Sequence, residues 1–339
     1  MRVWFNRTFS SVYAAISLIR EADADGKYYL IYSNANPHVA AGMVAHEFVL
    51  EPANLDGEDY LEWCLNFCRE HEVGIFIPGK AAALISSACD RFLAEGTRVL
   101  SVAKPEVLDL LHNKAEFYRT VELPCAPPAV CEPFENLMQF DAAHARLRSQ
   151  FSKLCIKPSK GVYGIGFSIL DEKRNCTELL LAGAQYQIGL EDFRAGLRNL
   201  ESIRTMLLME FLDGSEYSVD CVGDYGKLIC AIPRKKSSKA GQGQTIDLRP
   251  DILTATEQLA ALYQLNGIFN IQFRESAGEL RLLEINPRMS GGIGMACIAG
   301  PNLPYIALKG FDTGFQTVAV PPVRAGIRVA ELASPVELA

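Results

Sequence analysis

Hydrophobic and polar positions follow two different periods along the first hundred residues. Short apolar runs typical of strands occur at 2–6, 28–33, 46–51, 74–79 and 98–102. Between them, apolar residues recur every three or four positions, as in amphipathic helices, near 11–25, 58–71 and 80–95. This alternation predicts a parallel sheet with helices on both faces, which binds ligands beyond the carboxyl ends of its strands. No GxGxxG motif follows the first strand, which argues against a dinucleotide site.

The pattern changes twice further along the chain. Helical stretches at 105–122 and 138–150 flank a proline-rich connector, and two strands at 152–158 and 166–170 enclose a glycine-bearing loop. From about 206 onward the pattern is mainly strand-like, at 205–211, 216–222, 227–233, 269–275 and 279–286, with one helix at 251–265. Short turns between these strands predict an antiparallel sheet. We therefore expect an α/β (α+β) protein with three parts, 1–104, 105–205 and 206–339.

Composition narrows the class of protein. With 49% hydrophobic and 22% charged residues over 339 positions, the chain can bury a large core and is not predicted to be disordered. The formal charge of −7 argues against a general nucleic-acid or anionic-membrane binder. No apolar run is long enough to span a bilayer, and the N-terminus lacks the pattern of a secretory signal. Ten cysteines without a CxxC pair fit a reducing compartment, so we expect a cytoplasmic protein.

The loop between the strands at 152–158 and 166–170 combines glycines with lysines. It contains Lys157, Ser159, Lys160, Gly161, Gly164 and Gly166. Glycines allow several backbone N–H groups to face one anion, and the lysines add positive charge. The spacing is not that of a P-loop. A plain hairpin turn and a flap over phosphate groups both remain open.

Polar residues close the apolar strand that ends at 286. Strand alternation places Glu284 and Asn286 on one face, and Gln272 lies in the preceding strand. A carboxylate with amide oxygens suits Mg²⁺, and Arg288 could hold a phosphate with two hydrogen bonds. A surface strand with ordinary polar residues is the alternative. Because its neighbours are apolar, Glu284 is expected to be partly buried, which favours the metal site.

Two further segments carry chemistry-bearing residues. The segment 209–220 could present backbone groups to an adenine edge, or could be a hairpin with an acidic rim. The segment 233–245 gathers Arg234, Lys235, Lys236 and Lys239 beside glycines in an otherwise acidic chain. Either it is a solvated basic turn, or Arg234 turns towards phosphates while the remaining residues recognise an anionic substrate. In the second case, replacing Arg234 should abolish turnover and leave the fold intact.

Together these segments resemble the ATP-grasp superfamily, most closely its carbamoyl-phosphate-synthase-like branch. The resemblance covers most of the chain and is strongest where Asn-Ile-Gln-Phe (270–273) precedes Glu-Ile-Asn-Pro-Arg (284–288). It implies an N-terminal Rossmann-like pre-ATP-grasp domain, a lid and a C-terminal sheet, with ATP held between the lid and the sheet. At position 272, glutamine replaces the acidic residue commonest in the superfamily.

The resemblance also implies roles for individual residues. Lys114 and Lys157 would contact the nucleotide, and the loop 159–166 would cover its phosphates. Glu210, Phe211 and Leu212 would line the adenine site, with Glu216 on the ribose. Gln272, Glu284 and Asn286 would hold Mg²⁺, or Mn²⁺ in its place. Arg288 would contact the transferred phosphoryl group.

The implied activity is ATP-dependent ligation of a small carboxylate to an amine through an acylphosphate. No Ser-His-Asp or Cys-His grouping lies near these motifs, which fits a reaction without a protein nucleophile. The expected partners are therefore small molecules, with a homodimer left open. Two alternatives remain: phosphoryl transfer on bicarbonate or carbamate, and an ATP-binding regulatory module that does not catalyse a reaction.

Overall fold

Three β-sheets organise the part of the chain that the structure describes, which is all of 1–339 except 9–10, 162–163, 238–241, 333–334 and 338–339. The structure is a computed structural model. Its packing divides the chain into two units. Unit 1 comprises Met1–Asp109, Ser215–Phe273 and Glu284–Ala339, and unit 2 comprises Leu110–Gly214 and Arg274–Leu283. The three-part division predicted from the sequence remains a proposal about domains.

The N-terminal part of unit 1 is a five-stranded sheet in the order β3-β2-β1-β4-β5. All of its strand pairs are parallel, as predicted. The strands are β1 (Arg2–Phe5), β2 (Tyr29–Asn34), β3 (Glu47–Leu50), β4 (Val73–Ile77) and β5 (Arg98–Val99). The carboxyl ends of parallel strands meet at one edge, so the loops after β1 and β4 lie on the edge where ligands bind in such sheets.

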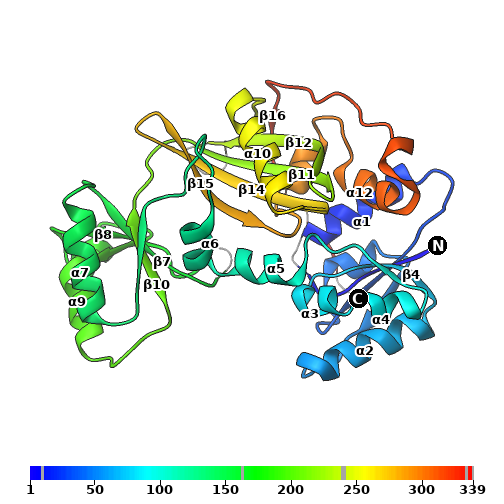
Figure 1. The fold of residues 1–339 in the computed structure, drawn as a ribbon, viewed down its shortest axis with the longest axis horizontal. Helices are drawn as coiled ribbons and strands as arrows, with labels where there is room; N and C mark the ends of the chain where they lie inside the picture. Colours follow the sequence, from blue (N-terminus) through cyan, green and yellow to red (C-terminus); the bar gives the residue numbers. More distant parts are fainter. Residues whose placement is uncertain (9–10, 162–163, 238–241, 333–334, 338–339) are drawn as a thin grey trace. The chain divides into compact units, whose positions relative to one another are not determined.

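Alternating side chains of β1 supply two different hydrophobic cores, which explains why both faces carry helices. Val3 and Phe5 face one core and Trp4 faces the other, where it stacks on Phe67 and Phe76 at ring distances of 4.2 and 4.1 Å. The helices of this part are α1 (Ser11–Ala22), η1 (Ala40–Met43), α2 (Gly57–Glu70), α3 (Ala82–Ser87) and α4 (Cys89–Ala94). Figure 1 shows α2 and α4 beside the parallel sheet. The single helix expected at 80–95 is thus two short helices.

The second sheet has six strands in the order β15-β14-β11-β12-β13-β16. Its strands are β11 (Glu216–Asp224), β12 (Lys227–Lys236), β13 (Gln244–Ile246), β14 (Gly267–Ser276), β15 (Glu279–Asn286) and β16 (Arg328–Val329). The pair β11–β12 is antiparallel, as the short turn between the two strands predicted. The pairs β12–β13 and β13–β16 are antiparallel too, and β13 and β16 were not predicted as strands. Strands β14 and β15 contribute residues to both units.

Helices of the C-terminal region complete the larger core of unit 1. They are α10 (Pro250–Leu262), α11 (Ile293–Cys297), α12 (Leu303–Thr313) and η2 (Phe315–Thr317). Ile293 and Ile306 share one buried cluster with Ile16 of α1, Phe5 of the parallel sheet and Ile232 of β12. The expectation of one helix after 206 was therefore wrong. Helices α11 and α12 are short, and no element was predicted for their residues.

Unit 2 is built on a five-stranded sheet in the order β6-β10-β7-β8-β9. The strands are β6 (Cys131–Phe134), β7 (Leu154–Pro158), β8 (Ser168–Asp171), β9 (Gln187–Gly189) and β10 (Met206–Glu210). The helices of this unit are α6 (Lys114–Thr120), α7 (Leu137–Arg148), α8 (Cys176–Leu181) and α9 (Leu190–Arg198), and α5 (Pro105–His112) has residues in both units. Figure 1 shows α7 and α9 on one face of this sheet, where Phe140 and Leu197 join its core.

The predicted α/β (α+β) fold class is confirmed, because parallel and antiparallel sheets both occur. The helix expected at 105–122 is interrupted at Asn113, which is the N-cap of α6. In the described residues no helix is both long and apolar enough to cross a bilayer.

Replacing Trp4 with alanine should lower the free energy of unfolding by about 3–5 kcal/mol, because a fully buried ring that stacks on two others is removed. Leu93→Ala, at a position 59% exposed on α4, is the control and should change it by less than about 0.5 kcal/mol. Urea unfolding measures both variants. A loss below about 1 kcal/mol for Trp4→Ala would contradict this account of the core.

Candidate functional site

A buried arginine network crosses the six-stranded sheet of unit 1. Arg234 of β12 is 2% exposed, and its Nε donates to Asp220 Oδ2 of β11 at 2.8 Å. Its other nitrogens donate to Ser218 Oγ at 3.2 Å, to Ser290 Oγ at 2.9 Å and to Gln244. Such a pair is costly to break, because either partner alone would be an uncompensated buried charge. The guanidinium is therefore engaged inside unit 1, and the expectation that it can be removed without loss of stability is corrected.

The network positions the segment that follows Asn286. Ser290 accepts from Arg234 and also from the backbone N–H of Gly292 at 3.2 Å. A Cβ at position 292 would lie 2.5 Å from an Arg234 nitrogen, so only glycine allows this close approach. Arg288 lies two residues before Ser290, so its backbone is anchored from the interior of the sheet.

The same network reaches the predicted metal ligand Gln272 through Asn270. Asn270 is fully buried, and its Nδ2 donates to Ser218 Oγ, Val219 O and Asp220 Oδ1 at 3.0–3.1 Å. Gln272 Nε2 donates to Asn270 Oδ1 at 3.4 Å. The sequence analysis did not single out Asn270 or Asp220, although a buried acid and amide at alternate positions near an arginine are the signal that could have found them.

Glu284 and Asn286 lie on one side of β15, as strand alternation predicted. Asn286 Nδ2 donates to Glu284 Oε1 at 2.9 Å, and both side chains are half-buried. Among the described residues no cluster of three His, Cys, Asp or Glu side chains could hold a metal ion. The predicted set consists instead of one carboxylate and two amides. Its oxygens fit a hard cation such as Mg²⁺, which keeps several waters and binds substrate phosphates.

In unit 2 the start of α6 is tied to the glycine-bearing loop. Lys114 Nζ donates to Gly161 O at 3.0 Å, and the Lys114 backbone N–H donates to Ser159 O at 3.0 Å. The Ser159 hydroxyl donates to Asn113 Oδ1 at 2.7 Å. Gly164 and Gly166 adopt left-handed φ of 67° and 82°, which favours glycine. Lys160 is exposed, and the predicted loop positions 162–163 lie outside the described residues.

Lys157 lies at the other end of this loop, on β7. Its Nζ donates to the Tyr118 hydroxyl at 2.9 Å and lies 4.9 Å from the centre of that ring. Burial raises the pKa of the Cys131 thiol to about 11 and that of Cys155 to about 12, and the Lys157 charge opposes both shifts. Both thiols are therefore protonated at neutral pH and are poor nucleophiles.

Backbone hydrogen bonds distinguish the three predicted adenine-site residues. The N–H of Glu210 donates to Val130 O, and the N–H of Phe211 donates to Lys153 O, both at 3.0 Å. The buried Glu210 carboxylate accepts from the Val130 N–H at 2.8 Å. Within the described residues the N–H of Leu212 has no hydrogen-bond acceptor. Leu212 is therefore the residue of this segment whose N–H is available to a ligand.

The predicted ribose contact Glu216 and the basic segment 233–245 meet in unit 1. The carboxylate of Glu216 accepts from Lys236, and Lys235 Nζ lies 5.6 Å from the Tyr217 ring centre. Lys239 lies outside the described residues. An ion pair thus holds the side chain that the resemblance assigns to the ribose, and its role there remains a prediction.

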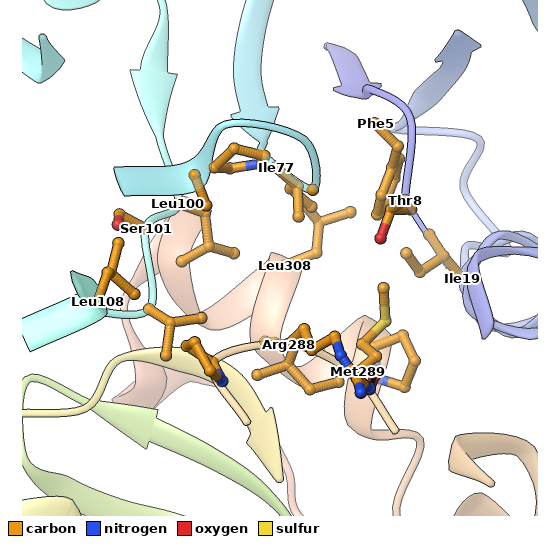
Figure 2. Close-up of a pocket in the computed structure, with 18 residues that line it drawn as sticks. Phe5, Thr8, Ile19, Ile77, Leu100, Ser101, Leu108, Arg288, Met289 and Leu308 are labelled. Atoms are coloured by element: carbon orange, nitrogen blue, oxygen red, sulfur yellow. Dashed lines mark hydrogen bonds between the residues drawn. The ribbon is translucent and has the colours of Figure 1, made fainter. Parts of the chain in front are cut away.

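A pocket opens at the carboxyl edge of the parallel sheet, within unit 1 (Figure 2). It has about 680 Å³ of free space, including its mouth to solvent. Thr8 after β1 and Pro78 and Gly79 after β4 line it, together with Arg288 and Met289 after β15. A Cβ on Gly79 would lie 2.3 Å from the Thr8 Cβ, so glycine allows these two loops to touch. A ligand site at the carboxyl ends of these strands was predicted from the alternation of strands and helices, without its lining residues.

Three polar residues of the loops after β1 and β4 serve other contacts. Asn6 is fully buried, and its side chain accepts from the Gly79 N–H at 2.5 Å and donates to the Tyr60 hydroxyl at 2.9 Å. Lys80 Nζ donates to Leu55 O at 2.6 Å. The backbone N–H of Arg7 donates to Glu51 Oε1 at 2.8 Å. Asn6 and Lys80 are not among the residues that line the pocket, and Asn6 instead fixes the loop that forms one wall.

Comparison with known proteins finds similarity to ATP-grasp proteins. Residues 202–335, which include Arg234, Glu284 and Arg288, match the family model described as ATP-grasp in the biosynthetic pathway with Ter operon. This C-terminal part of the chain therefore matches an ATP-grasp family model. The predicted resemblance, including its carbamoyl-phosphate-synthase-like character, is confirmed.

Two curated relatives match different shares of this chain. Carnosine synthase 1 of Mus musculus is 36% identical over 99 residues, which are 25% of this chain and 12% of that protein. The arginine-specific large chain of carbamoyl phosphate synthase of Geobacillus stearothermophilus is 23% identical over 319 residues, 89% of this chain and 27% of that protein. The chain thus spans a small part of the length of these relatives.

Solved structures show the same ATP-grasp fold over nearly the whole chain. An N5-carboxyaminoimidazole ribonucleotide synthetase in complex with ADP has a TM-score of 0.67 at 12% identity, covering 96% of this chain and 79% of that one. An L-amino acid ligase from Bacillus licheniformis has a TM-score of 0.60 at 14% identity, covering 91% and 73%. At these identities the likeness concerns the fold.

The predicted site residues fall into two groups, one in each unit. Unit 2 holds Lys114, Lys157, Ser159, Lys160, Gly161, Gly164, Gly166, Glu210, Phe211 and Leu212. Unit 1 holds Glu216, Arg234, Gln272, Glu284, Asn286 and Arg288. In unit 1 the arginine network connects Gln272 to Arg234, and in unit 2 the contacts of Lys114 connect α6 to the glycine-bearing loop. The functional roles of these residues remain predictions.

Arg234→Ala should lower the free energy of unfolding by about 3–5 kcal/mol, because it leaves the fully buried Asp220 carboxylate without its cation. Arg288→Ala, at a half-buried position on the pocket wall, should lower it by about 1 kcal/mol or less. Urea unfolding followed by circular dichroism measures both values. Equal small losses in the two variants would contradict the role given to the Arg234–Asp220 pair.

Proposed function

We propose that this protein is an ATP- and Mg²⁺-dependent ligase that activates a small carboxylate as an acylphosphate for attack by an amine. The observation that carries the proposal is the position of Arg288. It lines the pocket at the carboxyl edge of the parallel sheet and follows the Glu284–Asn286 pair by two residues. A carboxylate bound in that pocket would lie beside the residues that suit phosphoryl transfer.

The proposed reaction has two steps. A carboxylate oxygen attacks the γ-phosphorus of ATP, a new P–O bond forms, and the bond to the β-phosphate oxygen breaks to release ADP. The neutral amine then attacks the acyl carbon, a C–N bond forms, and the C–O bond to the phosphoryl group breaks. Inorganic phosphate leaves, and the amine proton passes to phosphate or solvent. No protein nucleophile takes part, which agrees with the protonated state of Cys131 and Cys155.

The residues of unit 1 supply the electrostatics of this chemistry. Arg288 would neutralise charge on the transferred phosphoryl group, and its guanidinium suits bidentate contact with phosphate or carboxylate. Glu284, Asn286 and Gln272 would hold Mg²⁺, or Mn²⁺, which when bound neutralises phosphate charge. The arginine network would support this function by holding Ser290, two residues after Arg288, and by contacting the Gln272 amide through Asn270.

The residues of unit 2 would bind the nucleotide. Lys114, through its contact with Gly161, and Lys157, on β7 just before the glycine-bearing loop, would offer positive charge to the phosphates, and the Leu212 N–H would donate to the adenine edge. This modifies the sequence-based assignment, because the N–H groups of Glu210 and Phe211 already have acceptors. A cytoplasmic location and a homodimer remain proposals.

Phosphoryl transfer on bicarbonate is the second candidate, since carbamoyl phosphate synthase chains are among the relatives. The pocket favours an organic acid instead, because most of its lining is apolar and bicarbonate has no apolar part to bury. A regulatory module without turnover is disfavoured by the joint presence of Lys114, Lys157, Glu284, Asn286 and Arg288.

The proposed function predicts that ADP release requires an organic acid together with ATP and Mg²⁺, and rises further when an amine is added. A coupled ADP-release assay over pairs of acids and amines, followed by mass spectrometry for an amide, measures this. Release driven by bicarbonate alone would support the second candidate. ATP binding in calorimetry without ADP formation across the panel would refute the ligase.

Lys157→Met should raise the KM for ATP by at least about tenfold, because a charge-assisted contact worth at least about 1.4 kcal/mol is lost. Lys173→Met is the matched control: it removes the same charge from an exposed position of unit 2 and should leave KM within about twofold. Initial rates of ADP release at varied ATP concentration measure both. Equal KM values in the two variants would contradict the assignment of Lys157.

A further inference from the structure

The pocket beside Arg288 has an unusual balance of lining residues for a site that accepts a charged substrate. Its walls are formed mainly by aliphatic, aromatic and proline side chains, among them Phe5, Ile19, Ile77, Leu100, Ile268 and Leu308. Figure 2 shows Ile77, Leu100 and Leu308 around the free space, with Arg288 and Met289 on another side of it. The hydroxyls of Thr8 and Ser101 are polar groups of this lining, and that of Ser101 already donates to Ala103 O at 2.8 Å. Burial of an apolar tail against such walls is favourable, at about 25 cal/mol per Å².

The charged groups of the lining are of one sign, positive. Among the described residues that line the pocket, Arg288 is the one with a charged side chain, and none is acidic. A carboxylate can therefore find a cation here. An α-ammonium group cannot find a carboxylate, and burying an unpaired ammonium group is strongly unfavourable. The lining thus distinguishes a simple carboxylic acid from an α-amino acid with the same side chain.

We infer that the acid substrate is an apolar carboxylic acid without an α-ammonium group, such as an aliphatic or arylalkyl acid. The inference deepens the proposed function and rests on it for the identity of this pocket as the acyl site. The carboxylate binds on the Arg288 side and the hydrocarbon tail lies against Ile77, Leu100 and Leu308. The amine that attacks the acylphosphate is a separate molecule and is not bound in this pocket.

Two small residues set the space available to the tail. Gly79 packs against Thr8 so closely that any side chain at 79 would displace the β1 loop. Ala82, at the start of α3, is half-buried and lines the pocket, whereas its neighbour Ala83 on the same helix does not. A larger side chain at 82 fills the space, and the same change at 83 leaves it free.

The test compares pairs of acids that differ in the α-ammonium group: 4-methylpentanoate with leucine, hexanoate with norleucine, and 3-phenylpropionate with phenylalanine. Isothermal titration calorimetry of the full chain without ATP measures binding of each. In at least one pair the simple acid should bind at least about tenfold more tightly than its amino acid.

Ala82→Phe should weaken the binding of that simple acid by at least about tenfold, and Ala83→Phe should leave it within about twofold. Ala82→Val, a smaller change, should give an intermediate loss and serves if the phenylalanine variant does not fold.

The outcomes separate this inference from the proposed function. A simple acid that binds, loses affinity in Ala82→Phe and gives no ADP release supports the selectivity of the pocket for apolar acids and refutes the ligase, and with it the role of that acid as a substrate. ADP release with amino acids, equal to or above that with the simple acids, leaves the ligase standing and overturns the inference. Absence of binding by every simple acid, or equal losses from Ala82→Phe and Ala83→Phe, also overturns it.

Discussion

The buried ion pair between Arg234 and Asp220 is the interaction on which the arrangement of unit 1 depends. Both groups are almost completely removed from solvent, so each needs the other, and the remaining hydrogen-bonding positions are filled by Ser218, Ser290 and Asn270. Through Ser290 the pair fixes the chain just after Arg288, and through Asn270 it contacts the amide of Gln272. A structural network and a candidate active site therefore share one set of strands.

This arrangement explains how the long Arg288 side chain can be held in place for a reaction that needs a fixed positive charge. Catalysis of phosphoryl transfer depends on cations that are already in place when charge develops, because reorganisation during the reaction would cost free energy. The Arg288 guanidinium donates to the Met289 carbonyl at 2.9 Å, which constrains its head group. Ser290, two residues further on, accepts from the buried Arg234, which constrains the backbone beside Arg288. The apolar walls beside it would exclude water, which otherwise hydrolyses an acylphosphate.

Much of the fold follows from periodicity that the sequence displays directly. The parallel sheet, the hairpin of β11 and β12, and the side shared by Glu284 and Asn286 were predicted, because each rests on local alternation of apolar and polar residues. The short helices α11 and α12 were missed, since five to eleven apolar-rich residues fit a strand as well as a helix.

The chemistry of single side chains was harder to predict. Arg234 was expected at the phosphates from its place in a basic segment, yet its partners come from residues 14 and 56 positions away. Only the structure distinguishes Leu212 from Glu210 and Phe211 as a hydrogen-bond donor. The carbonyls of Val130 and Lys153 accept from the N–H groups of Glu210 and Phe211. The pocket lining likewise combines residues from 5 to 308, and no local pattern brings them together. Such long-range pairings are fixed by the tertiary fold, which motif spacing does not encode.

The central claim is that phosphate is transferred from ATP to the carboxylate of the acid. It is tested most directly with an acid that supports ADP release, labelled with ¹⁸O in both carboxylate oxygens, and mass spectrometry of the products. The account predicts one ¹⁸O atom in the inorganic phosphate and one in the amide, because the carboxylate oxygen that attacks phosphorus leaves with it. Unlabelled phosphate formed along with the amide would contradict the acylphosphate, and label in AMP would show that the acid is activated as an adenylate instead.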